Sequence, residues 1–320
     1  MFRKVAKKAY HLLAGKRTDS ALAAWKQIDE LAKKSAPTMR GVRNDHPPLP
    51  QRLQQIPMAI KINENETLAQ LYNGKKIYVD ARDISLAPHI MIEGLWEAHV
   101  TRVIEQLLQE DDIFFDIGAN FAYYCCVAAP RLKNQLGRFN IHAFEANPDL
   151  IPLVTKTFDI NGLRDSAVIN NIAVSDKIGE LTLHRDENLW GSASLRKEVA
   201  RAKKETTYKV KTTSIDQYCN EHNIDRVDVI KLDIEGYEDR AYAGMKQTIQ
   251  KNPQLRIVME FTFDIYTNEQ AFFEQLKKDF SYMYFIDARG EYEFINEYKT
   301  LRNKTHNELA MVVLSNKELS

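Results

Sequence analysis

Asp111-Asp-Ile-Phe-Phe-Asp116-Ile-Gly118-Ala-Asn120 is the stretch that decides the fold of this 320-residue chain. Its apolar run, residues 113–115, is typical of a short strand buried on both faces. Asp116 ends that run, and Gly118 permits a sharp turn where a side chain would obstruct a ligand. Residues 121–129 then form a nearly continuous apolar segment that predicts a buried helix. Strand, acidic turn with glycine and buried helix together predict the opening of a nucleotide-binding βαβ unit.

Segments that favour strands alternate with segments that favour helices along the rest of the chain, which predicts a right-handed, doubly wound α/β sheet. The expected strands span residues 59–62, 76–79, 139–144, 167–174, 227–232, 255–259, 282–286 and 309–314, with an antiparallel pair at 179–184 and 207–213. The expected helices span residues 93–109, 148–160, 214–220, 237–250 and 267–278, the last with Gln270 placed for a capping box.

Four of these strands end on a carboxylate: Asp116, Glu145, Asp233 and Glu260. A buried strand that ends on a carboxylate loses stability unless the group is hydrogen-bonded or bound to a ligand. Because ligands of doubly wound sheets bind at the carboxyl ends of the strands, we expect the functional site there.

The turn after the first strand favours S-adenosylmethionine over a dinucleotide. A pyrophosphate needs a glycine-rich Gly-x-Gly-x-x-Gly turn, and here Asn120 stands in place of the second glycine. Asp116 would repel phosphates, whereas it can hold the cationic methionine end of S-adenosylmethionine. Glu145 is placed to accept hydrogen bonds from both ribose hydroxyls, a role that serves NAD equally well.

Three motifs carry a family resemblance. Phe-Asp-Ile-Gly-Ala-Asn-Phe-Ala-Tyr-Tyr at 115–124, Ala-Phe-Glu-Ala-Asn-Pro at 143–148 and Val-Ile-Lys-Leu-Asp-Ile-Glu-Gly-Tyr-Glu at 229–238 together resemble the FkbM family of class I methyltransferases. The resemblance covers roughly residues 75–314. It implies a Rossmann-like sheet of seven strands whose last strand is antiparallel. It also implies O-methylation that depends on S-adenosylmethionine, often of sugars in glycans, lipopolysaccharide or natural products.

The residues expected to bind the cofactor are Asp116, Gly118, Asn120, Glu145, Asn171 and Glu97. For three of them a simpler role stays open: Asn120 could cap a helix, Asn171 could form a turn instead of contacting the adenine edge, and Glu97 could lie on a solvated helix face. The resemblance places Glu97 near the methionine end of the cofactor. Ala122 and Ala146 depart from the glycine and proline usual in the family.

The expected catalytic residues are Asp233, Lys231, Glu260 and Glu235. Lys231 lies within an apolar strand, where an ammonium group needs a partner, and Asp233 or Glu235 can supply it. We expect the site to position the acceptor hydroxyl about 3–3.5 Å from the methyl carbon, with Asp233 as general base and Glu260 as second choice. A paired Lys231 that only orients the loop is the alternative. Asp233 and Glu260 could also hold a divalent metal, although no ligand spacing requires one.

Four further side chains have open roles. His142 lies in mid-strand and is expected to be a core histidine. Trp190 belongs to a polar excursion, residues 190–194, where it could stack on a sugar ring or pack as a hydrophobic lid. Tyr123 and Tyr124 open the buried helix, and one of them is expected to line the methyl pocket.

Residues 1–57 are expected to form an N-terminal helical arm with a proline-rich linker, and residues 58–320 the methyltransferase-like domain. The arm begins with a basic helix that could rest on the inner face of a membrane, contact another subunit or simply be solvated. A second, amphipathic helix is expected at residues 20–34. The apolar part of the first helix is too short for a secretion signal.

The net charge, the length of the apolar runs and the number of cysteines narrow the class of protein. The formal net charge is zero, so nothing favours nucleic acid. No apolar run approaches the roughly 18 residues that suggest a membrane span. Three cysteines make no disulfide framework, and a reducing cytoplasm fits them.

Three functions stay open on the sequence. The first is an S-adenosylmethionine-dependent O-methyltransferase that acts on a saccharide hydroxyl of a glycan, lipopolysaccharide or related glycoconjugate. The second is a nicotinamide-dependent oxidoreductase on the same kind of sheet, which the missing glycines disfavour. The third is a non-catalytic scaffold that keeps the fold while its N-terminal arm binds a partner.

Overall fold

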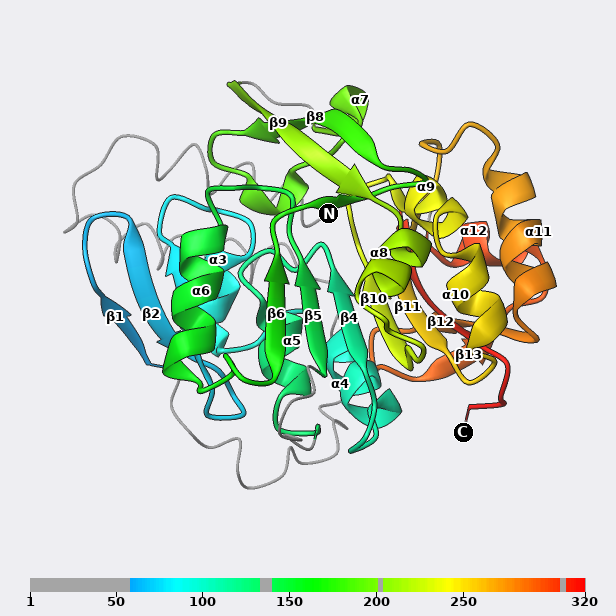
Figure 1. Ribbon diagram of the computed structural model, residues 1–320, viewed down its shortest axis with the longest axis horizontal. Helices are drawn as coiled ribbons and strands as arrows, with labels where there is room; N and C mark the ends of the chain where they lie inside the picture. The colour runs from blue at the N-terminus through cyan, green and yellow to red at the C-terminus, as the bar shows by residue number, and fades with distance from the viewer. Residues whose placement is uncertain (1–57, 133–139, 201–203, 306–308, 320) are drawn as a thin grey trace, which may run out of the picture. The chain divides into compact units, whose positions relative to one another are not determined.

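An eight-stranded mixed sheet lies at the centre of the described domain (Figure 1). In spatial order its strands are β13 (Tyr292–Phe294), β12 (Tyr282–Ile286), β14 (Leu309–Ser315), β11 (Arg256–Thr262), β10 (Val229–Leu232), β4 (Phe114–Ile117), β5 (Ile141–Phe144) and β6 (Ala167–Asn170). Strands β6, β5, β4, β10 and β11 are parallel, and β14 runs antiparallel to both of its neighbours. The predicted doubly wound fold with an antiparallel last strand is confirmed. Strand β13 adds an eighth strand, in a hairpin with β12.

The computed structural model describes residues 58–132, 140–200, 204–305 and 309–319. The expected basic helix, the helix at 20–34 and the linker lie outside these residues. No helix within the described ranges is long and apolar enough to cross a membrane.

Two hydrophobic clusters cover the two faces of the sheet. Phe114 packs into the first cluster with side chains of α3 (Ala87–Glu93), α4 (Ala98–Leu107), α5 (Tyr123–Ala128) and α6 (Ile151–Ile160). Phe115 and Ile117 pack into the second with side chains of α8 (Ile215–Glu221), α9 (Glu238–Ala243), α10 (Lys246–Lys251), α11 (Glu269–Asp279) and α12 (Tyr298–Lys304). Alternate residues of β4 therefore point to opposite helical layers, as a strand buried on both faces requires.

Two expected helices are interrupted. The segment 93–109 contains only α4, because α3 ends at Gly94 and the chain turns through Glu97 before α4 begins. The segment 237–250 divides into α9 and α10 at Gly244. A Cβ atom on Gly244 would lie 2.1 Å from the carbonyl oxygen of Ser175, so the chain packs there too closely for any side chain.

The last expected helix begins one residue later than a capping box requires. Its N-cap is Asn268, whose side chain accepts a hydrogen bond from the backbone of Ala271. Gln270 therefore lies one position before the site of a capping-box partner, and the prediction of a capping box was wrong.

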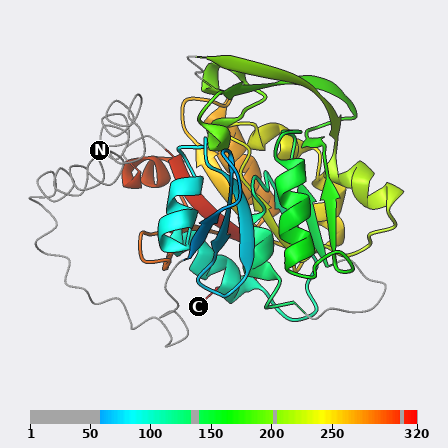
Figure 2. The ribbon, with the colours of Figure 1, turned by 90° about the vertical axis from the view of Figure 1, so that its left-hand side faces the viewer.

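Two smaller sheets flank the central one. The expected strand 167–174 divides into β6 and β7 (Ala173–Val174), since β7 leaves the central sheet to pair with β9 (Glu205–Thr213). Strands β8 (Gly179–Asp186) and β9 form the predicted antiparallel pair, which lies beyond the carboxyl ends of β4, β5 and β6 (Figure 1, Figure 2). The first sheet contains β1 (Ala59–Lys61), β3 (Lys76–Asp80) and the unpredicted β2 (Glu66–Gln70).

Candidate functional site

The carboxyl ends of four neighbouring strands bring the predicted residues together. Asp116 of β4 lies beside Lys231 of β10 in the sheet, and Glu260 lies in β11, the next strand along. Asp116 and Glu260 lie inside their strands rather than just after them, because each strand goes on pairing with its neighbours beyond the carboxylate. Glu145 directly follows β5.

Asp116 is completely buried. Its Oδ2 accepts a hydrogen bond from the thiol of Cys125 at 3.2 Å, and its Oδ1 has no hydrogen-bond partner among the described residues. Burial raises the pKa of this carboxyl, and the positive charge of Lys231 lowers it in part. One acceptor oxygen at the turn is therefore left to a ligand.

Gly118 has a different reason for being glycine from the one expected. Its backbone is left-handed, with φ of 84°, and a Cβ atom would lie 1.9 Å from the carbonyl oxygen of Asp233. The protein group that a side chain would strike is thus the backbone after β10. Gly118 lets the turn after β4 pack directly on the turn that carries Asp233.

Glu145 holds the turn after β4 from the neighbouring strand. Its Oε2 accepts a hydrogen bond from the backbone of Asn120 and its Oε1 from the backbone of Asn147, both at 2.7 Å. Burial raises the pKa of Glu145 to about 7. The Oδ1 of Asn120 is buried without a hydrogen-bond partner among the described residues. The turn therefore contains a second buried oxygen without a hydrogen-bond partner, close to Glu145.

Asn171 and Glu97 are the two remaining residues expected to bind the cofactor. The exposed Asn171 donates its amide hydrogens to the carbonyls of Glu145 and Ala146, which matches the turn-forming alternative. Glu97 accepts a hydrogen bond from the hydroxyl of Tyr124 at 2.8 Å. Burial, and then the negative charge of Asp233, raise the pKa of Glu97. Glu97 therefore faces the acidic rim rather than lying on a solvated helix face.

Of the two partners expected for Lys231, the structure pairs it with Asp233. The ammonium Nζ lies 2.9 Å from Asp233 Oδ2 and 4.8 Å from the ring centre of Tyr124. Burial lowers the pKa of Lys231, but Asp233, Asp116 and Glu97 more than offset this, and the pKa lies above its ordinary value. A charged ammonium thus lies between the turn after β4 and the turn after β10.

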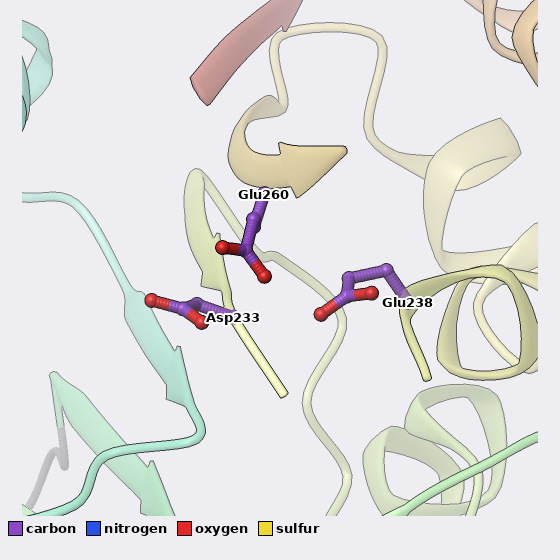
Figure 3. A group of neighbouring side chains, drawn as sticks. All are labelled: Asp233, Glu238 and Glu260. Atoms are coloured by element: carbon purple, nitrogen blue, oxygen red, sulfur yellow. The ribbon is translucent and has the colours of Figure 1, made fainter. Parts of the chain in front are cut away.

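Three carboxylates point toward one another beside this pair: Asp233, Glu238 and Glu260, here called the acidic cluster (Figure 3). One oxygen from each lies within 4.8 Å of the others. Burial raises the pKa of Glu238 to about 7 and that of Glu260 well above its ordinary value. The negative charge of the neighbouring carboxylates acts in the same direction, so Glu238 and Glu260 retain protons at a pH where exposed carboxylates have lost them.

Glu238 and Tyr266 join the two strands that carry the acidic cluster. Glu238 Oε1 accepts hydrogen bonds from the backbones of Ile234 and Gly236, which fixes the turn after β10. The hydroxyl of Tyr266 donates to Glu238 Oε2 at 2.9 Å and accepts from the backbone of Thr262 at the end of β11. Glu238 could be found from the sequence, because it closes the third motif, whereas nothing in the sequence marks Tyr266, an ordinary aromatic residue in a loop.

Glu235 lies in the same turn with a left-handed backbone, φ of 54°. Burial and the charge of Asp233 raise its pKa well above the ordinary value. Its carbonyl accepts a hydrogen bond from the hydroxyl of Ser194 at 2.7 Å. The segment 190–194 is thereby attached to the turn that carries Asp233.

Trp190 cannot stack on a sugar, because it is only 3% exposed and its ring is already covered. The guanidinium of Arg185 lies 4.4 Å from the ring centre, and Phe121 stacks on it at 6.4 Å. The lid alternative describes it better: Trp190 packs the segment 190–194 onto the start of the buried helix. His142 is a core histidine, as predicted, with Nδ1 2.9 Å from the hydroxyl of Tyr218.

The acidic cluster has the oxygen donors that a divalent cation takes, but protein groups already occupy oxygens of Asp233 and Glu238. Lys231 places an ammonium on Asp233, and Glu238 accepts three hydrogen bonds from protein groups. A cation at Asp233 would repel that ammonium at close range. Cys125, Cys126 and Cys219 are buried free thiols that do not approach the cluster as metal ligands.

Comparison with known proteins identifies the family. Residues 116–294, more than half of the chain, match the methyltransferase FkbM domain. The chain belongs to the FkbM methyltransferase family. The matched region contains both turns and the whole acidic cluster.

Two curated relatives are methyltransferases. The hexuronic acid methyltransferase AglP of Haloferax volcanii is 23% identical over 166 residues, which cover 50% of this chain and 63% of the relative. The 2-O-methyltransferase NoeI of Sinorhizobium fredii is 25% identical over 190 residues, which cover 55% of this chain and 72% of the relative. The chain thus spans less than two thirds of the length of the first.

A solved structure also resembles the chain at low similarity. It is the methyltransferase FkbM from Methylobacillus flagellatus, with 11% identity and a TM-score of 0.40, covering 65% of this chain and 44% of that one. The fold assignment above rests on the strand order, not on this likeness.

Proposed function

We propose that this protein transfers the methyl group of S-adenosylmethionine to a hydroxyl of a saccharide, in a glycan, lipopolysaccharide or related glycoconjugate. The observation that carries the proposal is the contact between two turns. The turn after β4 presents unsatisfied oxygens, and it packs through Gly118 against the turn that carries Asp233 and the acidic cluster. A donor held by the first turn would lie next to an acceptor held by the second. The names of the two curated relatives support the acceptor class.

The residues of the first turn fit this cofactor. Asp116 Oδ1 and Asn120 Oδ1 are buried acceptors without hydrogen-bond partners among the described residues, and such atoms are costly unless a donor reaches them. An ammonium group can supply donors to both. Glu145 uses one lone pair of each oxygen for the backbone and retains capacity for two ribose hydroxyls. When bound, the cofactor supplies an electrophilic methyl group.

The acidic cluster and Lys231 can position the acceptor and take its proton. Asp233 forms an ion pair with the Lys231 ammonium at 2.9 Å, which holds its carboxylate in place. Burial and the neighbouring carboxylates raise the pKa of Glu260 well above its ordinary value, so Glu260 in its protonated form can donate a hydrogen bond to the acceptor oxygen. We therefore assign removal of the hydroxyl proton to Asp233 and orientation of the hydroxyl to Glu260, with Glu260 as the second choice of base and with Glu235 and Glu238 holding the turn.

The test is calorimetric titration of S-adenosylhomocysteine into the wild type and into Glu145→Ala. We expect the variant to bind roughly 1–3 kcal/mol more weakly, because it loses charge-assisted hydrogen bonds to the ribose. Glu145→Gln, which keeps one acceptor for the backbone of Asn120, checks that the turn itself has not collapsed. Asp216→Ala is the matched control, because Asp216 lies in α8, away from the turn after β4, and also accepts two backbone hydrogen bonds, which come from Gln247 and Thr248 of α10.

Two outcomes would contradict the proposal. Absence of heat and of a thermal shift, with a folded and ligand-free wild type, would remove the methyltransferase assignment, and enhanced NADH fluorescence would then support the oxidoreductase. Tight binding that is equally strong in both Glu145 variants would keep the cofactor but remove Glu145 from its site.

A further inference from the structure

A hollow of about 420 Å³ opens between the loop after β11 and helix α12. Tyr266, Thr267 and Gln270 line it from the loop and the start of α11, and Tyr298 and Arg302 line it from α12. Its volume lies within the range of about 300–1,000 Å³ that is typical of small-molecule sites. Of these five side chains, only Tyr266 has a role in the cofactor site or the acidic cluster described above.

The strand order places this hollow on the acceptor side of the site. Strand β10 lies between β4 and β11, so the turn that carries Asp233 has the cofactor turn on one side and the loop after β11 on the other. Both loops follow the carboxyl ends of parallel strands and hence lie at the same edge of the sheet. A molecule in the hollow would approach the acidic cluster from the side opposite Glu145.

Tyr266 connects the hollow with the acidic cluster. Its side chain is 6% exposed, and its hydroxyl donates to Glu238, a member of the cluster. The wall of the hollow is therefore one hydrogen bond away from the carboxylates that would receive the acceptor hydroxyl. A saccharide chain that reaches the cluster with one residue could place its next residue in the hollow.

The positive charge in the hollow, the guanidinium of Arg302, is already paired. The guanidinium of Arg302 donates through Nη2 to Asp264 at 2.8 and 2.9 Å and through Nη1 to Glu269. Two carboxylates against one guanidinium leave the lining negative, which disfavours a carboxylated sugar. The exposed hydroxyl of Thr267 and amide of Gln270, together with the ring of Tyr298, are groups that bind uncharged sugar hydroxyls and sugar faces.

We propose that this hollow is a subsite for an uncharged sugar residue of the acceptor, adjacent to the residue that is methylated. The inference rests on the proposed function, because it names a second part of the same acceptor. It adds that the enzyme recognises at least two sugar residues.

The test fills the hollow without breaking a described hydrogen bond. Thr267→Trp places an indole in it, and Thr300→Trp, at an exposed position of α12 that does not line the hollow, is the matched control. The wild type and both variants are applied with S-adenosylhomocysteine to an array of neutral and uronic-acid-bearing oligosaccharides. We expect Thr267→Trp to lose binding at least tenfold to array members that have an uncharged residue beside the bound one, with S-adenosylhomocysteine affinity within twofold of the wild type.

Other outcomes separate the failure of this inference from that of the proposed function. Equal array binding by both variants and the wild type would overturn the subsite, and a preference for uronic residues that Thr267→Trp abolishes would overturn its chemistry. Binding of S-adenosylhomocysteine without binding to any array member would overturn both the saccharide acceptor and the subsite. Only a wild type that binds no S-adenosylhomocysteine would contradict the methyl donor itself.

Discussion

Glu238 makes the stability of the protein depend on pH in a direction unusual for a carboxylate. Its ordinary pKa of 4.5 is raised to about 7 by burial, so the folded state binds more protons than the unfolded state between these values. Stability is therefore greatest below pH 4.5 with respect to this group and falls as the pH rises toward 7. We expect the free energy of unfolding of Glu238→Gln to gain roughly 1–3 kcal/mol relative to the wild type between pH 5 and 8.

Urea unfolding of the wild type and of Glu238→Gln at pH 5 and at pH 8 measures this difference. Glu274→Gln, which alters an exposed glutamate of α11, controls for the loss of one negative charge. A Glu238→Gln variant that tracks the wild type at both pH values would mean that the buried carboxyl is ionised throughout, held so by its backbone donors.

Tyr266→Phe tests the bridge between β10 and β11. The substitution removes one hydroxyl that donates to Glu238 and accepts from Thr262, so Asp233 and Glu260 lose the link between their strands. We expect kcat with a saccharide acceptor to fall roughly 10- to 100-fold, because small displacements of positioning groups are costly, while affinity for S-adenosylhomocysteine stays unchanged. Tyr242→Phe is the control, since Tyr242 is equally buried and donates to Asp279 at 2.9 Å. Equal losses in both variants would point to general destabilisation.

For individual residues, the sequence predicted which residue types lie close together but not which atoms are in contact. The neighbourhood of Asp116, Lys231 and Asp233 follows from strand ends and spacing, both of which a sequence displays. The contact of Gly118 with the carbonyl of Asp233, and the reach of Tyr266 to Glu238, depend on how two loops pack in space. Trp190 was open to two interpretations for the same reason, because its cover comes from Arg185 and Phe121.

The geometry of the turn after β4 can be tested by adding one methyl group, the Cβ of an alanine at position 118. Gly118→Ala combines a left-handed backbone with a Cβ atom 1.9 Å from Asp233, whereas Gly162→Ala has a similar φ of 66° and no atom within 4 Å. The backbone cost of about 1–2 kcal/mol is common to both, and overpacking adds about 1–3 kcal/mol at Gly118 alone. Urea unfolding should show this difference, and titration with S-adenosylhomocysteine should show weaker binding only for Gly118→Ala. Equal costs would mean that the turn yields without strain.

Strands were easier to predict than their interruptions. The central strands β4, β5 and β10 are short apolar runs buried on both faces, so composition alone identifies them. The division of 167–174 into β6 and β7 was missed, because pairing of β7 with β9 is decided by a partner about 40 residues away. Strands β2 and β13 were missed because polar residues interrupt their apolar pattern, although β2 lies between β1 and β3 and β13 lies at the edge of the central sheet.

For the domain as a whole, ligand binding should act on a single cooperative transition. The proposed site takes residues from β4, β5, β10 and β11, which form the middle of the sheet between both hydrophobic clusters. S-adenosylhomocysteine at 100 times its dissociation constant should stabilise the folded state by about 2.7 kcal/mol and raise Tm by roughly 5–10 °C. Scanning calorimetry measures the shift. Two transitions of which only one moves would show that part of the sheet unfolds independently of the site.

The position of β14 also governs how the chain is made. Residues 309–315 lie between β11 and β12 in the sheet, although they follow both strands in the sequence by many residues. While the ribosome synthesises the chain, the hairpin of β12 and β13 has no neighbour that it can join, and the open edge of β11 faces solvent. The half of the sheet that carries the cofactor turn can pair beforehand, since β4, β5, β6 and β10 are all complete by residue 232. A nascent chain halted before β14 is therefore able to build the proposed donor side of the site while the proposed acceptor side is still an exposed strand edge, and we expect the chain to be most prone to aggregation at this stage.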